Sequence, residues 1–190
     1  MSIALRFLPP LVWSALIGWC SGAGFSAAAT APFLEPWLRA TLPWASPEQI
    51  AALHWLLRKA GHVVEYAVLA LLWSRALAAE PRTAPWRRPL LLAALTAVLD
   101  EAHQATTHVR EGSVADVLLD TAAATAALGV TVAGARRAAL VLARALLWIP
   151  AAGGTILLAI DAGAAAPSGW VWLDVAAAWL SLWYWRRGRA

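Results

Sequence analysis

The chain has 190 residues, of which 61% are hydrophobic and 14% are charged, and its mean hydropathy is +0.63. This composition, with several apolar runs of about 20 residues, places it in the membrane class. The formal net charge of +4 comes from arginines that cluster in loops, where they set membrane topology, and does not indicate nucleic-acid binding. Cys20 is the single cysteine, which excludes an internal disulfide.

The first apolar stretch has two interpretations. Arg6, the apolar run that starts at Leu11 and the AAATA segment together resemble a cleavable signal peptide. We favour an uncleaved first transmembrane helix over residues 10–29, because the charge distribution described below requires an N-terminus inside the cell. Residues 32–58 contain many prolines and tryptophans, which predict an extended loop. A short interfacial helix is expected after Ser46, where SPEQ has the form of a capping box.

Further transmembrane helices are predicted over residues 61–77, 90–107, 114–132, 140–160 and 170–185. A kink is expected in the fourth of these segments, at Pro150 and the Gly153–Gly154 pair. We therefore expect an all-α protein: a polytopic membrane helix bundle of about six transmembrane helices, forming one integral membrane domain over residues 1–190.

A polar stretch, DEAHQATTHVREGSVADVLLD, lies between two of these apolar runs. Ionisable residues are rare in membrane helices unless they face a cavity or one another. Asp100 and Gln104 share one helix face, and Asp116 and Asp120 share a face of the next helix. A short turn that contains Arg110 makes the two helices adjacent and antiparallel. The carboxylates and the guanidinium are thus expected to converge at one end of a helix pair.

A second polar group stands at the entrance of the helix over residues 61–77. Lys59, His62 and Tyr66 are spaced i, i+3, i+7, so they lie on one helix face, and Glu65 is close to the same face. Lys59 is the only lysine beside 14 arginines. This bias hints that an ammonium is required at this position.

The basic residues also predict the orientation in the membrane. With this set of helices, 11 lysine and arginine residues fall on one side and 4 on the other. The positive-inside rule then places both termini in the cytoplasm. Under this topology the polar residues lie in the outer half of the membrane, and their site opens to the extracytoplasmic face.

The segments RKAGHVVEYAVLALLWSRAL and DEAHQATTHVREGSVADVLLDTAAA resemble the VanZ-like family of bacterial membrane proteins. The family pattern is K-x-x-H-x-x-x-Y, then D-E-x-x-Q, then R, then D-x-x-x-[DN]. The residues at these positions are Lys59, His62, Tyr66, Asp100, Glu101, Gln104, Arg110, Asp116 and Asp120. The resemblance covers residues 58–134, a VanZ-like core, and leaves residues 138–190 as an additional C-terminal helix pair. The chain departs from the family at residues 106–109, where a phenylalanine and a Pro-Gly are common, and at Ala123, which replaces a common glycine.

The resemblance implies a multi-pass protein of the bacterial plasma membrane that is related to resistance to the glycopeptide teicoplanin. The partners implied are membrane lipids, lipid-linked envelope precursors or the glycopeptide itself. It also implies a site at the nine family positions. We assign candidate catalytic roles to His62, Asp100, Glu101, Asp116 and Asp120. Candidate substrate-binding roles go to Lys59, Tyr66, Gln104 and Arg110.

Three functions remain open from the residues. The first is an enzyme that acts on a lipid-linked phosphate or headgroup, with Lys59 and Arg110 holding phosphate and His62 as acid/base or nucleophile. The second is a transporter or lipid-binding protein. The third is a non-catalytic polar network that holds the helices together, although interhelical hydrogen bonds in membranes contribute only ~0.6 kcal/mol each. A divalent cation held by carboxylate oxygens is a further possibility, whereas a zinc-type ligand motif is absent from the sequence.

Overall fold

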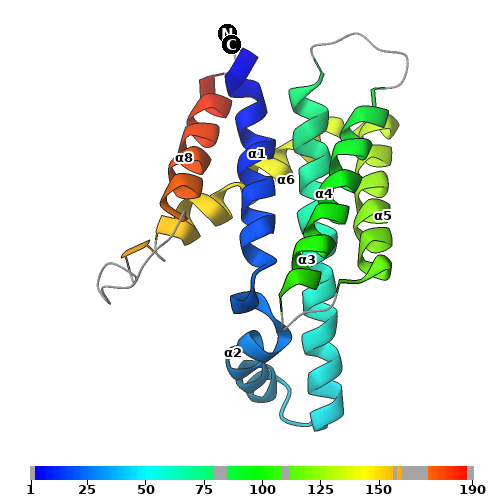
Figure 1. Cartoon of the computed structure of the whole chain (residues 1–190), viewed down its shortest axis with the longest axis vertical. Helices are drawn as coiled ribbons and strands as arrows, with labels where there is room; N and C mark the ends of the chain where they lie inside the picture. Colours follow the sequence, from blue (N-terminus) through cyan, green and yellow to red (C-terminus); the bar gives the residue numbers. More distant parts are fainter. Residues whose placement is uncertain (1–2, 79–84, 108–111, 156–157, 160–170, 188–190) are drawn as a thin grey trace.

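A computed structural model describes residues 3–78, 85–107, 112–155, 158–159 and 171–187. Every regular element in these ranges is helical, as predicted. The elements are α1 (Ile3–Cys20), η1 (Ala23–Phe25), α2 (Ala27–Thr41), α3 (Pro47–Ala76), α4 (Arg87–Thr106), α5 (Val114–Val130), η2 (Thr131–Ala135), α6 (Arg136–Leu146), η3 (Ile149–Gly153) and α8 (Val171–Arg187). Helices α1, α3, α4, α5 and α8 run along the long axis of the molecule, and α6 runs across them (Figure 1).

Helix α3 is the centre of the bundle, because it packs against α1, α4 and α5. Its face carries Tyr66, Leu69 and Leu72, which are buried in one cluster with residues of α1. The facing positions of α4 and α5 are small residues, including Ala97 and Ala124, which are fully buried. Small side chains allow helix backbones to approach closely. This close approach brings the polar ends of α3, α4 and α5 to one place.

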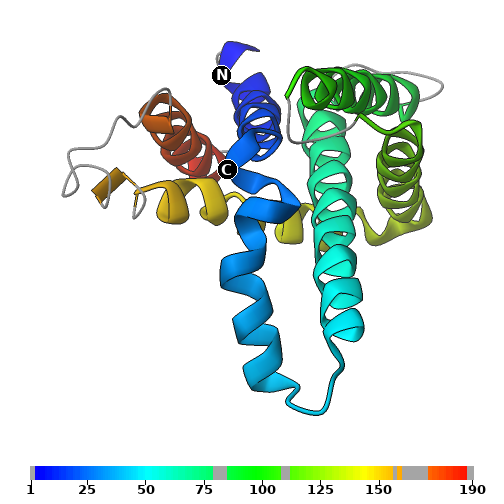
Figure 2. The same cartoon turned by 60° about the horizontal axis from the view of Figure 1, so that its bottom comes forward.

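The loop predicted over residues 32–58 is wrong. Residues Ala27–Thr41 form α2, and α3 begins at Pro47 (Figure 2). Pro32 and Pro36 lie inside α2. A proline inside a helix removes one N–H from the hydrogen-bond ladder, and its ring clashes with the carbonyl group of residue i−4. It therefore kinks or weakens a helix without always ending it. Figure 2 shows α2 beside the first half of α3, and the two helices are joined by a short connection.

The predicted capping box is confirmed, but it opens a helix of 30 residues and not a short interfacial one. Ser46 Oγ accepts from the backbone N–H of Gln49, and the Gln49 side chain accepts from the N–H of Ser46. The Ser46 hydroxyl also donates to Glu48 at 2.6 Å. This hydrogen bond lowers the pKa of the exposed Glu48 carboxyl.

Several helix boundaries also differ from the prediction. The first helix is Ile3–Cys20 and not residues 10–29; it ends before the 3-10 turn η1. The helix predicted over residues 140–160 already begins at Arg136 and is interrupted after Leu146, next to η3, which contains Pro150. The interruption therefore falls where the kink was predicted. Gly134, with φ of +93°, separates α5 from α6 in a conformation that favours glycine.

The length and hydropathy of each helix bear on the membrane bundle predicted from composition. Among the described helices, none taken singly has both the length and the hydropathy of a membrane span. The segments Leu5–Cys20 and Ala23–Thr41 satisfy both conditions as a pair that is bent by 75°. The all-α fold is thus confirmed, and the six membrane crossings stay a prediction.

Candidate functional site

Helix α4 contributes three buried polar side chains from its last two turns. Asp100, Glu101 and Gln104 are 6%, 5% and 3% exposed. Gln104 Nε2 donates to Asp100 Oδ2 at 3.1 Å, as expected for an i, i+4 pair. This hydrogen bond fixes the rotamer of the Asp100 carboxylate within the bundle.

The start of α5 lies directly against the end of α4. Ser113 caps α5, because its Oγ accepts from the N–H of Asp116 at 3.3 Å. The N–H of Ser113 donates to Glu101 Oε2 at 2.7 Å. Gly112 permits this contact, since a Cβ at this position would be 2.6 Å from the carbonyl oxygen of Glu101. The turn therefore orients a carboxylate of the preceding helix.

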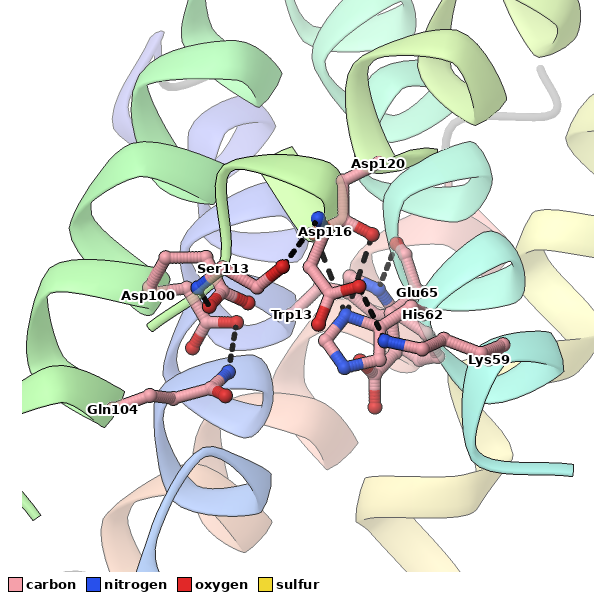
Figure 3. A network of polar contacts seen from close by, with 10 residues as sticks. Trp13, Lys59, His62, Glu65, Asp100, Gln104, Ser113, Asp116 and Asp120 are labelled. Atoms are coloured by element: carbon pink, nitrogen blue, oxygen red, sulfur yellow. Dashed lines mark hydrogen bonds and ion pairs between the residues drawn. The ribbon is translucent and has the colours of Figure 1, made fainter. Parts of the chain in front are cut away.

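Helix α3 brings two cationic or titratable groups to the acids of α5. The ammonium of Lys59 donates to Asp116 Oδ1 in a short charge-assisted hydrogen bond. One turn further along, His62 Nδ1 lies 3.3 Å from Asp120 Oδ1 and 3.4 Å from Asp120 Oδ2. The Asp120 side chain is fully buried. Figure 3 shows that these side chains point toward one another from α3 and α5.

Four of the predicted residues form a compact group, which we call the His62 cluster: His62, Asp100, Glu101 and Asp120. All four are buried, and one ligand atom from each lies within 4.8 Å of the corresponding atoms of the others. Asp100 Oδ1, Glu101 Oε1 and Asp120 Oδ1 make no hydrogen bond within the described residues. Carboxylate oxygens and imidazole nitrogens are metal ligands, so this cluster is the group that could hold a cation.

Two further predicted site residues have different outcomes. Tyr66 is fully buried, and its hydroxyl lacks a hydrogen-bond partner in the part of the chain that the structure describes. Tyr66 follows His62 by four residues, so it lies about one turn further along the same face of α3. Arg110 lies outside the described residues.

Two cavities adjoin the site. The first, which we call the polar cavity, has a volume of about 410 Å³, and its charged or polar lining includes Arg58, His62, Asp100 and Gln104. The second, which we call the apolar cavity, has a volume of about 500 Å³ and lies between α1, α3, η3 and α8. Both cavities are lined by Cys20, Phe25, Gly61 and Glu65. A polar chamber and an apolar chamber thus share one wall.

Comparison with known proteins identifies the family of the chain. A model of the VanZ/LLP1 family matches residues 13–135. The chain belongs to the VanZ/LLP1 family. No curated protein and no solved structure matches the chain.

The VanZ/LLP1 region contains the whole His62 cluster together with Lys59 and Asp116. It extends further toward the N-terminus than the resemblance over residues 58–134, so it also covers α2 and the part of α1 from Trp13 onward. Helix α8 lies outside this region but lines the apolar cavity with Asp174 and Val175. The helix thus supplies part of a cavity wall that the family match does not include.

The sequence analysis missed several polar residues near the polar cavity. His54 is buried, and its Nε2 lies 2.9 Å from Thr30 Oγ1 of α2, while its Nδ1 lies 3.6 Å from Glu35 Oε1. The indole N–H of Trp13 donates to the carbonyl oxygen of Glu65 at 2.8 Å. His54 precedes His62 by eight residues on one helix. The spacing would have placed both on one face if α3 had been predicted at its full length.

Proposed function

We propose that this VanZ/LLP1 protein is an integral protein of the bacterial plasma membrane that binds a phosphate-bearing lipid and acts on its headgroup. The observation that carries the proposal is the shared wall of the two cavities. The two cavities differ in the number of charged groups that line them, which matches a ligand with a polar headgroup and an apolar chain. Membrane lipids and lipid-linked envelope precursors have this character, and a chamber of about 500 Å³ is within the size range of ligand pockets.

The polar cavity has one cation, Arg58, among its described lining residues, beside the carboxylates of Glu65 and Asp100. Arg58 lines it, and Lys59 stands next to it on α3 with its ammonium on Asp116. Guanidinium and ammonium groups are the usual protein partners of phosphate. His62 is the candidate acid/base group, because an imidazole held by a buried carboxylate has a defined tautomer and orientation. We assign the orienting role to Asp120.

The exterior of α4 supports contact with lipid. Leu91, Leu95, Val98 and Leu99 are all more than half exposed, and their spacing places them on one stripe of the helix. Exposed apolar stripes of this kind mark membrane or protein contacts. A membrane location also agrees with the composition and with the family. The outward opening of the site, the envelope role and the link to teicoplanin resistance belong to this proposal as its consequences.

The lipid part of the proposal is tested by native mass spectrometry of the purified protein. Gly61 lines both cavities, and a Cβ there meets no atom within 4 Å, so Gly61→Phe can place a ring between the chambers. We expect this variant to lose lipid that co-purifies with the wild type. Gly18→Phe is the matched control, because Gly18 is exposed on α1 with equally open space. Equal lipid retention in both variants would contradict the proposal.

The headgroup chemistry is tested by lipid analysis of membranes with and without the protein. We expect a changed headgroup or lipid-carrier pool with the wild type and with Glu48→Gln, an exposed carboxylate on the same helix. His62→Ala and Asp116→Asn should abolish this change and leave a folded, inserted protein. An altered leaflet distribution without altered composition would instead indicate lipid transport. If the lipid composition is the same with and without the protein, and the cellular phenotype of the wild type is kept in His62→Ala and Asp116→Asn, the polar contacts among α3, α4 and α5 would have only a structural role.

A further inference from the structure

The His62 cluster places three carboxylates and one imidazole together in a buried position within the described part of the chain. Asp100, Glu101 and Asp120 are each more than nine-tenths buried, and each has an oxygen without a hydrogen-bond partner in the described ranges. The ammonium of Lys59 is engaged with Asp116. Buried carboxylates are stable only when protons, a paired cation or a metal compensates their charge.

The spacing of the four ligand atoms favours a metal ion over protons or a paired side-chain cation. Four atoms that lie within 4.8 Å of one another can all be reached from one point at about 3 Å or less. A hard divalent cation binds oxygen at about 2.0–2.6 Å, so sub-ångström side-chain adjustments bring all four atoms into contact with it. Two ligands at right angles on such an ion are about 3 Å apart. The 3.3 Å between His62 Nδ1 and Asp120 Oδ1 is close to this separation.

We propose that the His62 cluster is a binding site for a divalent cation of the Mn²⁺, Mg²⁺ or Ca²⁺ class. Three carboxylates and one imidazole favour hard, oxygen-preferring cations, among which Mn²⁺ also accepts nitrogen readily. The proposal rests on these four side chains and does not require the lipid.

The groups around the cluster hold its ligands as outer-shell residues hold the ligands of known metal sites. Gln104 donates to Asp100 Oδ2, which leaves Asp100 Oδ1 for the ion. The N–H of Ser113 donates to Glu101 Oε2, which likewise leaves Glu101 Oε1. Such second partners fix the orientation of metal-binding carboxylates. In both acids, the oxygen without a partner is the one that remains for a cation.

The cluster is also accessible from the polar cavity. His62 and Asp100 line this cavity, whereas Glu101 and Asp120 are not among its lining residues. An ion in the cluster would therefore be held by two ligands at the cavity wall and two behind it. Its position would let a phosphate in the polar cavity reach the ion.

The test uses the purified full-length protein in detergent, stripped with a chelator and titrated with Mn²⁺. We expect stoichiometric binding by electron paramagnetic resonance and a higher midpoint of thermal unfolding with Mn²⁺ than without it. Pulsed resonance spectra should show coupling of the bound Mn²⁺ to an imidazole nitrogen, and this coupling should disappear in His62→Ala. No stoichiometric Mn²⁺ binding, or bound Mn²⁺ without nitrogen coupling, would overturn the assignment.

Substitutions distinguish Mn²⁺ binding at the His62 cluster from nonspecific attraction of Mn²⁺ to any carboxylate. Asp120→Asn and Glu101→Gln should each weaken Mn²⁺ binding at least ~10-fold. Asp174→Asn is the matched control: Asp174 is also buried with a carboxylate oxygen that has no partner within the described residues, but it lies on α8 outside the cluster. Unchanged affinity in both cluster variants, or an equal loss in Asp174→Asn, contradicts the proposal. Because the titration contains no added lipid, its failure would not affect the lipid-binding test.

Discussion

Gly112 lies close to the last turns of α4. An added Cβ would be 2.6 Å from Glu101 O and 3.0 Å from Ala105 Cβ, so the turn must move to accept it. We expect Gly112→Ala to lower the free energy of unfolding by about 1–3 kcal/mol, the usual cost of overpacking. Gly129→Ala is the control, because open space surrounds that position and alanine favours a helix. Chemical unfolding in detergent measures both, and equal effects would contradict the prediction.

The Lys59–Asp116 pair is the contact that ties α3 to the first turn of α5. Its side chains are 25% and 14% exposed, so solvent screens the pair only in part. We expect a double-mutant cycle of Lys59→Met and Asp116→Asn to give a coupling energy of about 0.5–3 kcal/mol. The same cycle with Lys59→Met and Glu48→Gln should be additive, because Glu48 lies at the far end of α3. Additivity in both cycles would mean that the pair contributes nothing to stability.

At this scale the sequence predicted which residues share a helix face, and it missed what orients them. The i, i+4 spacing of Asp116 and Asp120 predicted that both lie on one face of a helix. In the structure that face meets Lys59 and His62 of α3. The hydrogen bond from Ser113 N–H to Glu101 depends instead on the path of a turn. The path of a turn depends on its tertiary contacts, which the helical periodicity of a sequence does not predict.

At the scale of elements, His54 of α3 makes polar contacts with Thr30 and Glu35 of α2. Thr30 Oγ1 lies 2.9 Å from His54 Nε2 and also donates to the backbone of its own helix. We expect Thr30→Ala to increase amide hydrogen exchange throughout α2 about fivefold, which corresponds to one hydrogen bond of about 1 kcal/mol. Thr41→Ala is the matched control, since Thr41 Oγ1 donates only to carbonyls within α2. Equal rates of amide hydrogen exchange in Thr30→Ala and Thr41→Ala would show that the Thr30–His54 contact does not hold α2 against α3.

The same region shows why elements were harder to predict than residues. Prolines at positions 32, 36, 43 and 47 were interpreted together as a loop signal. Two of them lie inside α2, and Pro47 occupies the first position of α3, where its missing N–H has no partner to lose. Only the residues between α2 and α3 behave as predicted from their composition. Helix α2 packs against α3, and such tertiary packing stabilises a helix that prolines weaken. This packing cannot be read from the composition of the segment.

At the scale of the whole molecule, the helix ends divide the bundle into two poles. Helices α1 and α4 begin, and α3 and α8 end, at the top of Figure 1, whereas α4 ends and α5 begins lower in the view, toward α2 and the first part of α3. Arg6, Arg75 and Arg87 belong to helix ends at the first pole. The arrangement in space therefore separates the ends that the charge distribution assigns to opposite sides of a membrane.

This separation leads to a test of the predicted orientation. Translocation of short basic loops is resisted, so the pole with the excess of arginines should be cytoplasmic and the turn before α5 should face outwards. In a Cys20→Ser background, we expect Ser113→Cys to react with a membrane-impermeant thiol reagent that is added outside intact cells. Thr83→Cys should react only after the membrane is permeabilised. The reverse labelling pattern would turn the polar cavity toward the cytoplasm, where soluble phosphate compounds and not envelope lipids would be the relevant ligands.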